Sequence, residues 1–117
     1  MSPSGAEYIR QIKTQVQEVD PAQVSEHLGN GIVLVDVRES TEWDAGHIPG
    51  SVHVPYHDLH AVPDGIDPER PIAAICGSGQ RSAVAASMLQ RLGARDVIHV
   101  VDGGVPRWRR EGWPIER

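Results

Sequence analysis

Residues 72–82 form the stretch IAAICGSGQRS, in which an apolar run, Ile72 to Ile75, leads directly into Cys76. A short continuous apolar run is typical of a strand that is buried on both faces of a parallel sheet. Glycines at positions 77 and 79 favour an irregular loop after this strand. Apolar residues at helical spacing then extend to Leu92, and Gly93 can end the helix. The stretch therefore predicts a strand, a tight loop and a helix, with Cys76 at the carboxyl end of the strand.

The rest of the chain alternates strand and helix patterns around this unit. Aliphatic and β-branched runs predict further strands at residues 32–37, 51–54 and 97–101. Helical patterns predict helices at residues 20–29, 41–45 and 56–61, and a last helix around Trp108. Strands that alternate with helices form βα units. We therefore expect an α/β fold, an open and mostly parallel sheet with helices on both faces.

The start of the chain departs from this alternation. Apolar residues recur at helical spacing at positions 8, 9, 12 and 16, after a segment of Ser, Pro and Gly. We expect residues 1–18 to form an N-terminal extension or helical linker. Residues 19–117 then form one domain, which is long enough for a compact core of its own.

Composition and charge limit the kinds of partner that we expect this protein to bind. The 117 residues carry a formal net charge of −5, which argues against a broad basic surface for nucleic acid. We interpret the short cluster Arg107, Arg109 and Arg110 as a solvated helix face. No apolar segment is long enough to cross a bilayer, so no membrane association is expected. A single cysteine cannot form an internal disulfide, and a cytoplasmic location is the default expectation.

Six histidines raise the question of a metal site. His57 and His60 are one helical turn apart and His53 precedes them, but Pro55 interrupts the group. Neither a cysteine nor a carboxylate completes a recognisable ligand pattern, whereas catalytic zinc usually has three protein ligands. We expect neither a metal nor a cofactor.

The surroundings of Cys76 favour a thiolate. The glycines allow successive backbone N–H groups to point inwards as an anion-binding nest, and the following helix adds its N-terminal N–H groups. Arg81 contributes a permanent positive charge. Such surroundings lower the pKa of a cysteine thiol. An inert core cysteine needs none of these features, so we predict that Cys76 is a nucleophile.

In combination, the motifs resemble the rhodanese-like family. The resemblance covers about residues 19–114 and rests on three segments, of which the first is the Cys76 loop. The second is an upstream group, Asp36-Val37-Arg38, Glu42-Trp43, Gly46-His47-Ile48 and Gly50. The third is a closing group, Asp102-Gly103-Gly104, Trp108, Gly112 and Pro114. It implies a sheet of about five mostly parallel strands. It also implies a ping-pong sulfur transfer in which Cys76 carries the sulfur as a persulfide.

The resemblance also assigns site residues. The persulfide would be held by the backbone of the loop residues, which are Gly77, Ser78, Gly79, Gln80, Arg81 and Ser82. Arg81 could orient an anionic donor or brace the loop through a salt bridge. Arg38 could bind the donor, or pair with Asp36 or Glu42. Asp36, Glu42 and His47 are expected to give structural support.

Several substrates and partners stay open at this point. Donors could be thiosulfate, mercaptopyruvate or a low-molecular-weight persulfide, and acceptors could be glutathione, thioredoxin or cyanide. Family members that use thiosulfate often have a basic residue after the cysteine, where this chain has Gly77. A persulfide-processing partner enzyme, such as a persulfide dioxygenase, is a further expectation.

Two other functions also stay open. Phosphatases with a cysteine nucleophile have a similar loop, but with a longer spacing than the four residues that separate Cys76 from Arg81. A tighter loop suits a terminal sulfur atom better than a phosphoryl group. A non-catalytic binding module or persulfide relay could keep the same fold, although an intact cysteine and nest argue against a purely inert module.

Overall fold

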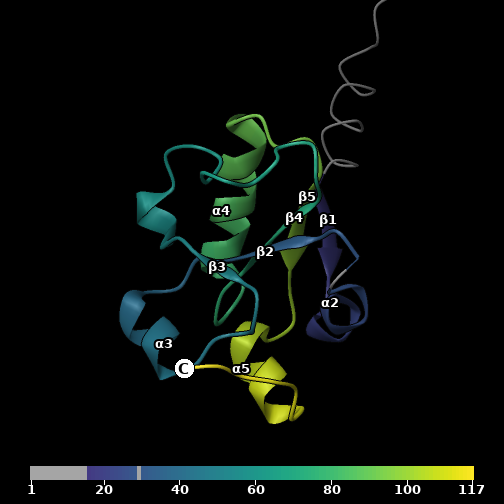
Figure 1. Ribbon diagram of the computed structural model, residues 1–117, viewed down its shortest axis with the longest axis vertical. Helices are drawn as coiled ribbons and strands as arrows, with labels where there is room; N and C mark the ends of the chain where they lie inside the picture. Colours follow the sequence, from purple (N-terminus) through teal and green to yellow (C-terminus); the bar gives the residue numbers. More distant parts are fainter. Residues whose placement is uncertain (1–15, 29) are drawn as a thin grey trace, which may run out of the picture.

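The centre of the molecule is a five-stranded parallel sheet. The computed structural model describes residues 16–28 and 30–117. The strands lie in the order β1-β5-β4-β2-β3, and each neighbouring pair is parallel (Figure 1). Their bounds are Val16–Val19 for β1, Val33–Asp36 for β2, Val52–His53 for β3, Ile72–Ile75 for β4 and Val97–Val100 for β5. The expected α/β fold with about five mostly parallel strands is confirmed.

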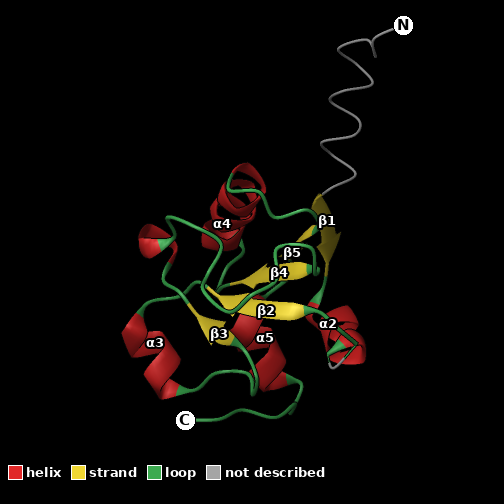
Figure 2. Ribbon diagram, turned by 45° about the horizontal axis from the view of Figure 1, so that its top comes forward, coloured by secondary structure: helices red, strands yellow, loops and turns green. Residues whose placement is uncertain are grey.

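Helices cover both faces of this sheet. The bounds are Pro21–His27 for α2, Ser40–Ala45 for α3, Gln80–Arg91 for α4 and Gly104–Arg110 for α5. Figure 2 shows α4 on one side of the sheet, and α2 and α5 on the other. The start of α2 is a capping box, in which Asp20 and Gln23 exchange hydrogen bonds of 2.9 and 3.0 Å.

One expected helix is shorter than its pattern suggests. Residues 56–61 were expected to be helical, but only a 3₁₀ turn forms, Tyr56–Asp58. Leu59 takes an extended backbone conformation and buries its side chain in the core cluster that also holds α4. Burial of this leucine therefore outweighs continuation of a polar helix.

The side chains of β4 alternate between two core clusters. Ile72 and Ala74 pack with α4 residues, whereas Ala73 and Ile75 pack with residues of α2 and α5. Cys76 continues this period of two and belongs to the cluster on the α4 side. The thiol is thus directed toward the face on which α4 begins.

Strand β1 lies largely within the segment that was expected to be an N-terminal extension. Val16–Val19 pairs with β5 in the register Val16 with Val97 and Val19 with Val100. The sheet therefore includes residues 16–18, which the helical spacing had assigned to the N-terminal extension. The strand is short and lies at the sheet edge, where Gln17 and Glu18 can stay exposed, so it lacks the apolar run of a buried strand. Residues 1–15, which carry most of the expected helical pattern, lie outside the described residues.

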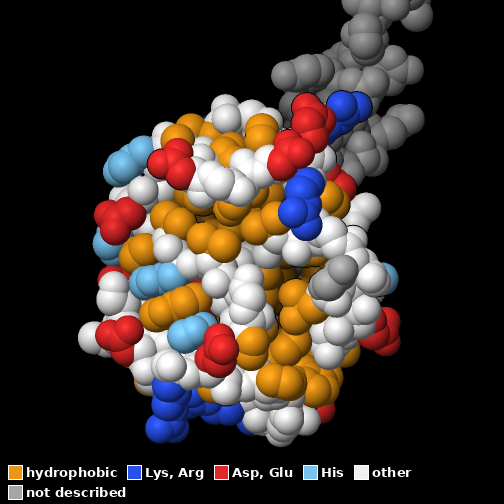
Figure 3. Space-filling model, viewed as in Figure 1, with side chains coloured by type: hydrophobic (Ala, Val, Ile, Leu, Met, Phe, Trp, Pro, Cys, Tyr) orange, Lys and Arg blue, Asp and Glu red, His pale blue; other side chains and the backbone are white. Residues whose placement is uncertain are grey.

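The arginines of α5 make contacts within the molecule. Figure 3 shows a group of arginine side chains at the lower edge, on the side where Figure 1 places α3, α5 and the C-terminus. Arg107 lies 3.9 Å from Asp20 and 3.8 Å from Glu111, and Arg109 donates a 2.9 Å hydrogen bond to the carbonyl of Ala45. Parts of the arginine cluster therefore connect α5 to its neighbours. Within the described ranges, none of the helices combines the length and the apolar character that a bilayer span requires.

Candidate active site

The candidate site lies where β2 and β4 end side by side. Asp36 and Ile75 are register partners at the carboxyl ends of these two strands, and Cys76 follows directly. Residues 77–79 then turn the chain into α4, and Gly79, the N-cap of that helix, has a φ of 98°. This left-handed conformation is easily adopted only by glycine, which explains why the turn can be so short. In parallel sheets, the carboxyl ends of strands are the usual place for a ligand site.

The loop surrounds the sulfur with hydrogen-bond donors. The amide of Gly79 lies 3.0 Å from Cys76 Sγ, and the amide of Ser82 lies 3.3 Å from it. The Ser82 hydroxyl is 3.3 Å from the same sulfur. Two of the amides that were expected to face Cys76 therefore do so. The amide of Gln80 has another partner, the hydroxyl oxygen of Ser78 at 3.5 Å.

These donors change the acidity of the thiol. Burial on its own raises the pKa of Cys76, because it disfavours the charged form. The Ser82 hydroxyl and the amides of Ser82, Gly79 and Ser78 act in the opposite direction and outweigh burial. The pKa of the Cys76 thiol is therefore lowered from its ordinary value, as predicted for a nucleophile.

The thiol is nevertheless covered by the loop. Cys76 has 0% of its surface exposed, and Ser82 beneath the loop is equally buried. Ser78 and Gln80 are exposed and form the outer side of the loop. In this conformation the sulfur is therefore closed to an external reagent.

Arg81 is engaged in an ion pair with Glu42. Its two terminal nitrogens donate hydrogen bonds of 2.6 and 3.0 Å to the two carboxylate oxygens, which ties the start of α4 to α3. The hydrogen bonds lower the pKa of Glu42 and raise that of Arg81. A side chain at Gly77 would lie 3.3 Å from Arg81 Nη2 and 3.7 Å from Glu42 Oε2, so the pair sits against the loop. In this structure Arg81 braces the loop.

Arg38 is engaged as well. Its Nε and Nη2 atoms donate hydrogen bonds of 2.8 to 3.0 Å to both carboxylate oxygens of Asp36, and Nη2 also reaches the carbonyl of Gly46 at 2.8 Å. Asp36 is 1% and Arg38 6% exposed. The structure thus places Arg38 in a buried pair, with little of its guanidinium open to a ligand.

His47 and two other histidines make contacts that are structural and lie away from the thiol. The His47 ring stacks on Trp43 with centroids 3.6 Å apart, and His53 stacks on the same indole at 4.7 Å. The backbone of His47 pairs with that of Glu116 near the end of the chain. His57 lies by contrast between Glu39 and Asp58, whose hydrogen bonds raise its pKa. Across the described ranges, three or more metal-binding side chains do not come together as a group.

Two residues near the site were not assigned to it from the sequence: Gly104, which was quoted only as part of the closing group, and His99. Gly104 lies so close to Cys76 that a Cβ atom there would collide with the Cys76 carbonyl oxygen, which accepts a 3.0 Å hydrogen bond from the amide of Val105. His99 lies beneath the loop, with Nε2 2.9 Å from Ser82 Oγ. The sequence signals were a glycine pair directly after a strand and one polar residue inside the apolar run at residues 97–101.

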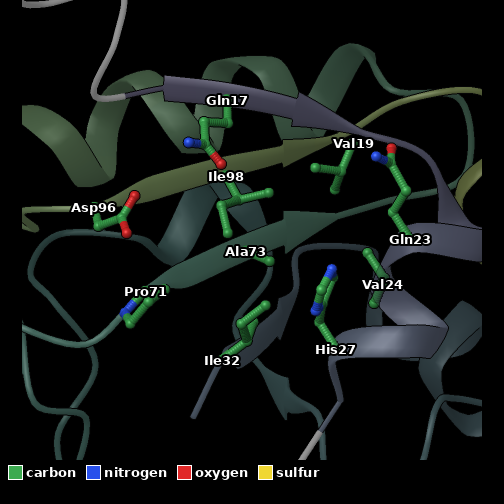
Figure 4. A pocket seen from close by; sticks show the side chains of 10 residues that line it. All are labelled: Gln17, Val19, Gln23, Val24, His27, Ile32, Pro71, Ala73, Asp96 and Ile98. Carbon is green, nitrogen blue, oxygen red and sulfur yellow. The ribbon is translucent and has the colours of Figure 1, made fainter. Parts of the chain in front are cut away.

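A pocket lies apart from this site, between β1 and α2. Its volume is about 340 Å³. Figure 4 shows Gln17 and Val19 of β1 on one side of it and residues of α2 on the other. Ala73 and Ile98, at its floor, belong to the cluster on the α2 and α5 face. Because Cys76 points to the α4 face, this pocket does not contain the thiol.

Comparisons with known proteins agree with this fold. The chain is 36% identical over 96 residues to thiosulfate sulfurtransferase GlpE of Pseudomonas fluorescens, covering 82% of this chain and 87% of that protein. A rhodanese-related protein of Thermoplasma volcanium superimposes with a TM-score of 0.73 at 31% identity, over 86% of this chain and 97% of that one. A Rhodopseudomonas palustris protein described as a possible tyrosine phosphatase gives 0.74 at 26% identity, over 99% and 96%. The rhodanese-like domain family matches residues 20–111, a segment that includes the whole Cys76 loop, and the chain therefore belongs to this family.

Proposed function

We propose that this protein is a sulfurtransferase in which Cys76 carries a sulfane sulfur atom as a persulfide. The observation that carries the proposal is the contact of Cys76 Sγ with the amides of Gly79 and Ser82, at 3.0 and 3.3 Å. These donors favour an anionic sulfur at the end of β4. The named activity of the Pseudomonas fluorescens relative supports the same reaction class.

The first half-reaction loads the sulfur. The Cys76 thiolate attacks the outer sulfur of thiosulfate, a bond from Sγ to that sulfur forms, and the sulfur–sulfur bond of the donor breaks. Sulfite leaves with the electron pair, and Cys76 becomes a persulfide anion. Loop amides stabilise this anion as an oxyanion hole does, where loss of one donor costs about 2.7–4 kcal/mol of transition-state stabilisation.

The second half-reaction returns the enzyme to its starting state. Cyanide or the thiolate of an acceptor, such as glutathione or thioredoxin, attacks the terminal sulfur. The persulfide bond breaks, Cys76 leaves as a thiolate, and the products are thiocyanate or a persulfide of the acceptor. Neither step needs a metal or a cofactor.

Access to the buried thiol is part of the proposal. We assign the opening to residues 77–80, because Gly77 and Gly79 can change backbone conformation at little steric cost. The added sulfur then occupies the space that the loop vacates. The Arg81–Glu42 pair lies against Gly77 and limits this movement.

The remaining site residues act as support in this scheme. Arg81 braces the loop rather than binding the donor, since both of its terminal nitrogens contact Glu42. Asp36 and Arg38 hold the chain after β2, and His47 holds the end of α3 through its stack with Trp43. Thiosulfate is the first donor to test, and mercaptopyruvate and glutathione persulfide are the others. A cytoplasmic setting and a persulfide-processing partner enzyme belong to the same proposal.

Mass spectrometry of the intact protein tests the proposal. The protein is treated separately with thiosulfate, mercaptopyruvate and glutathione persulfide, and Cys76→Ser serves as the control. We expect the mass of one sulfur atom to appear on the wild type with at least one donor, to disappear on addition of cyanide, and to be absent from the variant. No sulfur uptake from any donor would instead support a non-catalytic module.

A phosphatase assay addresses the alternative raised by the Rhodopseudomonas palustris protein. Four residues separate Cys76 from Arg81, and the guanidinium is held by Glu42. We therefore expect no turnover of an aryl phosphate above that of Cys76→Ser. Phosphate release without sulfur uptake would replace the sulfurtransferase proposal.

A further inference from the structure

His99 is a buried imidazole beside the reactive sulfur that the scheme above does not use. It lies on β5, where its register partners are Glu18 of β1 and Ala74 of β4. It is 9% exposed, although the surrounding strand positions are apolar. A buried polar ring in such a strand requires partners for both nitrogens.

The first nitrogen connects His99 to the thiol through one hydroxyl. Nε2 lies 2.9 Å from Ser82 Oγ and 2.9 Å from the carbonyl of Gly79. Ser82 Oγ in turn lies 3.3 Å from Cys76 Sγ. Imidazole, hydroxyl and sulfur thus form a continuous chain of polar contacts beneath the loop.

The second nitrogen faces a carboxylate. Nδ1 lies 3.6 Å from Glu18 Oε2, whose side chain is 68% exposed. A carboxylate and a carbonyl can only accept hydrogen bonds, so Glu18 and Gly79 both suit a ring that carries a proton on each nitrogen. When Nε2–H donates to Ser82, the hydroxyl proton of Ser82 can point at the sulfur or at the carbonyl of Gly79, which lies 3.2 Å from Ser82 Oγ.

We propose that His99 takes up, through Ser82, the proton that Cys76 releases, and that the resulting imidazolium holds the sulfur in its anionic form. The S–H proton passes to Ser82 Oγ, and the hydroxyl's own proton passes to Nε2 of the neutral ring. The products are a thiolate and an imidazolium that share the serine hydroxyl, and the reverse transfer restores the thiol. His99 is therefore a positioning residue that deepens the proposed function, since it acts through Ser82 on the proposed nucleophile.

The charges around the ring come from three elements. Glu18 approaches from β1, Cys76 from the end of β4, and Ser82 joins them from α4 without a charge. The exposed Glu18 is expected to contribute little, as solvent screens such pairs. The coupling of His99 to Cys76 through Ser82 is therefore the interaction that the experiments must isolate.

Alkylation of Cys76 by iodoacetamide across a range of pH tests the proposal. In His99→Gln, the side-chain amide can still donate to Gly79 and Ser82 but cannot become charged. We expect the thiol pKa of this variant to rise, so that alkylation well below that pKa slows about tenfold. His60→Gln, an exposed histidine outside the site, is the matched control and should leave the profile unchanged.

Titration of His99 by NMR gives the reciprocal measurement. Cys76→Ser keeps a similar side-chain shape but does not ionise, so His99 should lose its proton at a lower pH in this variant than in the wild type. Linkage requires the two effects to be of similar size. An unchanged His99 titration, or an unchanged alkylation profile in His99→Gln, would overturn the proposal and leave His99 as a structural residue.

These measurements are independent of sulfur transfer. Alkylation and titration report proton coupling even if no donor loads Cys76, whereas the mass-spectrometric test of the persulfide does not depend on His99. Should His99→Gln fail to fold, the comparison of wild type with Cys76→Ser still decides the matter.

Discussion

Cys76 combines complete burial with a lowered thiol pKa. Burial alone would favour the neutral thiol, but hydrogen bonds from three backbone amides and the Ser82 hydroxyl stabilise the thiolate and outweigh the cost of burial. The consequence is a sulfur whose anionic form is already favoured while the loop covers it. In the proposed scheme, the rate at which Cys76 reacts therefore depends on two quantities: the fraction of the thiol that is ionised, and the fraction of time for which the loop is open.

An alkylation profile separates these two quantities. We expect the midpoint for folded protein to lie below that of the urea-unfolded chain, which should ionise near an ordinary thiol pKa of about 8.5. The plateau rate at high pH should be lower for folded protein, because the loop covers Cys76. Equal midpoints in the two states would contradict the stabilised thiolate.

The same pKa shift predicts a pH dependence of stability. A thiol pKa that is lower in the folded state gives a stabilising contribution that is fully present above the unfolded thiol pKa. This contribution is lost as the pH falls through the folded pKa. The difference in free energy of unfolding between the wild type and Cys76→Ser should follow this course in urea titrations.

Gly104 is expected to tolerate no side chain. It has a φ of +52°, and a Cβ atom would meet the Cys76 carbonyl oxygen. Gly65→Ala is a matched control, since Gly65 has a φ of +84° and open space around it. Both variants should lose roughly 1–2 kcal/mol through the left-handed backbone, and Gly104→Ala about 1–3 kcal/mol more through overpacking. Urea unfolding measures the free energy of unfolding of both variants. Equal losses of stability would contradict the close contact between Gly104 and the Cys76 carbonyl.

The β4–α4 loop is held by contacts from three other elements. Glu42 of α3 binds Arg81, His99 of β5 binds Ser82, and Val105 of α5 donates to the Cys76 carbonyl. Each element meets the loop because the parallel strands end at the same edge of the sheet. The loop conformation therefore depends on the packing of the sheet as much as on its own glycines.

A double-mutant cycle measures the brace between α3 and α4. We expect Glu42→Gln and Arg81→Gln to be coupled by about 0.3–1 kcal/mol at neutral pH, since both side chains are partly exposed. The cycle for Glu69 and Arg95, which are 3.1 Å apart and far more exposed, is the comparison and should give less. Equal coupling in both pairs would argue against a special role for Arg81.

The coupling energy between Glu42 and Arg81 should also depend on pH, and it should fall as the pH falls. Its hydrogen bonds with Arg81 lower the pKa of Glu42, so the coupling is fully present above the ordinary glutamate pKa of about 4.3. It should decline only as the pH falls below that value and through the lower pKa of the folded state. Repetition of the cycle at pH 7, 5 and 4 checks this order.

Strand β1 is an edge strand of the sheet and pairs with β5. Val19 packs against the cluster on the α2 and α5 face, and Glu18 reaches the site histidine. A chain that lacks residues 1–19 should thus be less stable than one that lacks residues 1–15, by about 2–4 kcal/mol if several net hydrogen bonds are lost. Urea unfolding of the two truncations tests this, and equal stabilities would show that β1 is dispensable.

Much of the fold was predictable because its signals are local. The apolar runs of β2, β4 and β5 mark buried strands wherever they occur, and the capping box at Asp20 specifies a helix start from adjacent residues. The loop glycines, with Cys76 between a strand and a helix, predicted the position of the thiol. Edge strand β1 carries two polar residues and gave no comparable pattern.

What the sequence alone determined is a set of elements and one chemically unusual loop. Which side chains meet at that loop was decided by the tertiary structure: Glu42 and Arg81 are 39 positions apart, and Ser82 and His99 are 17 apart. Contacts at such separations depend on strand order and register, which no local pattern encodes. The choice of Arg81 as a brace and the place of His99 behind Ser82 follow from that packing.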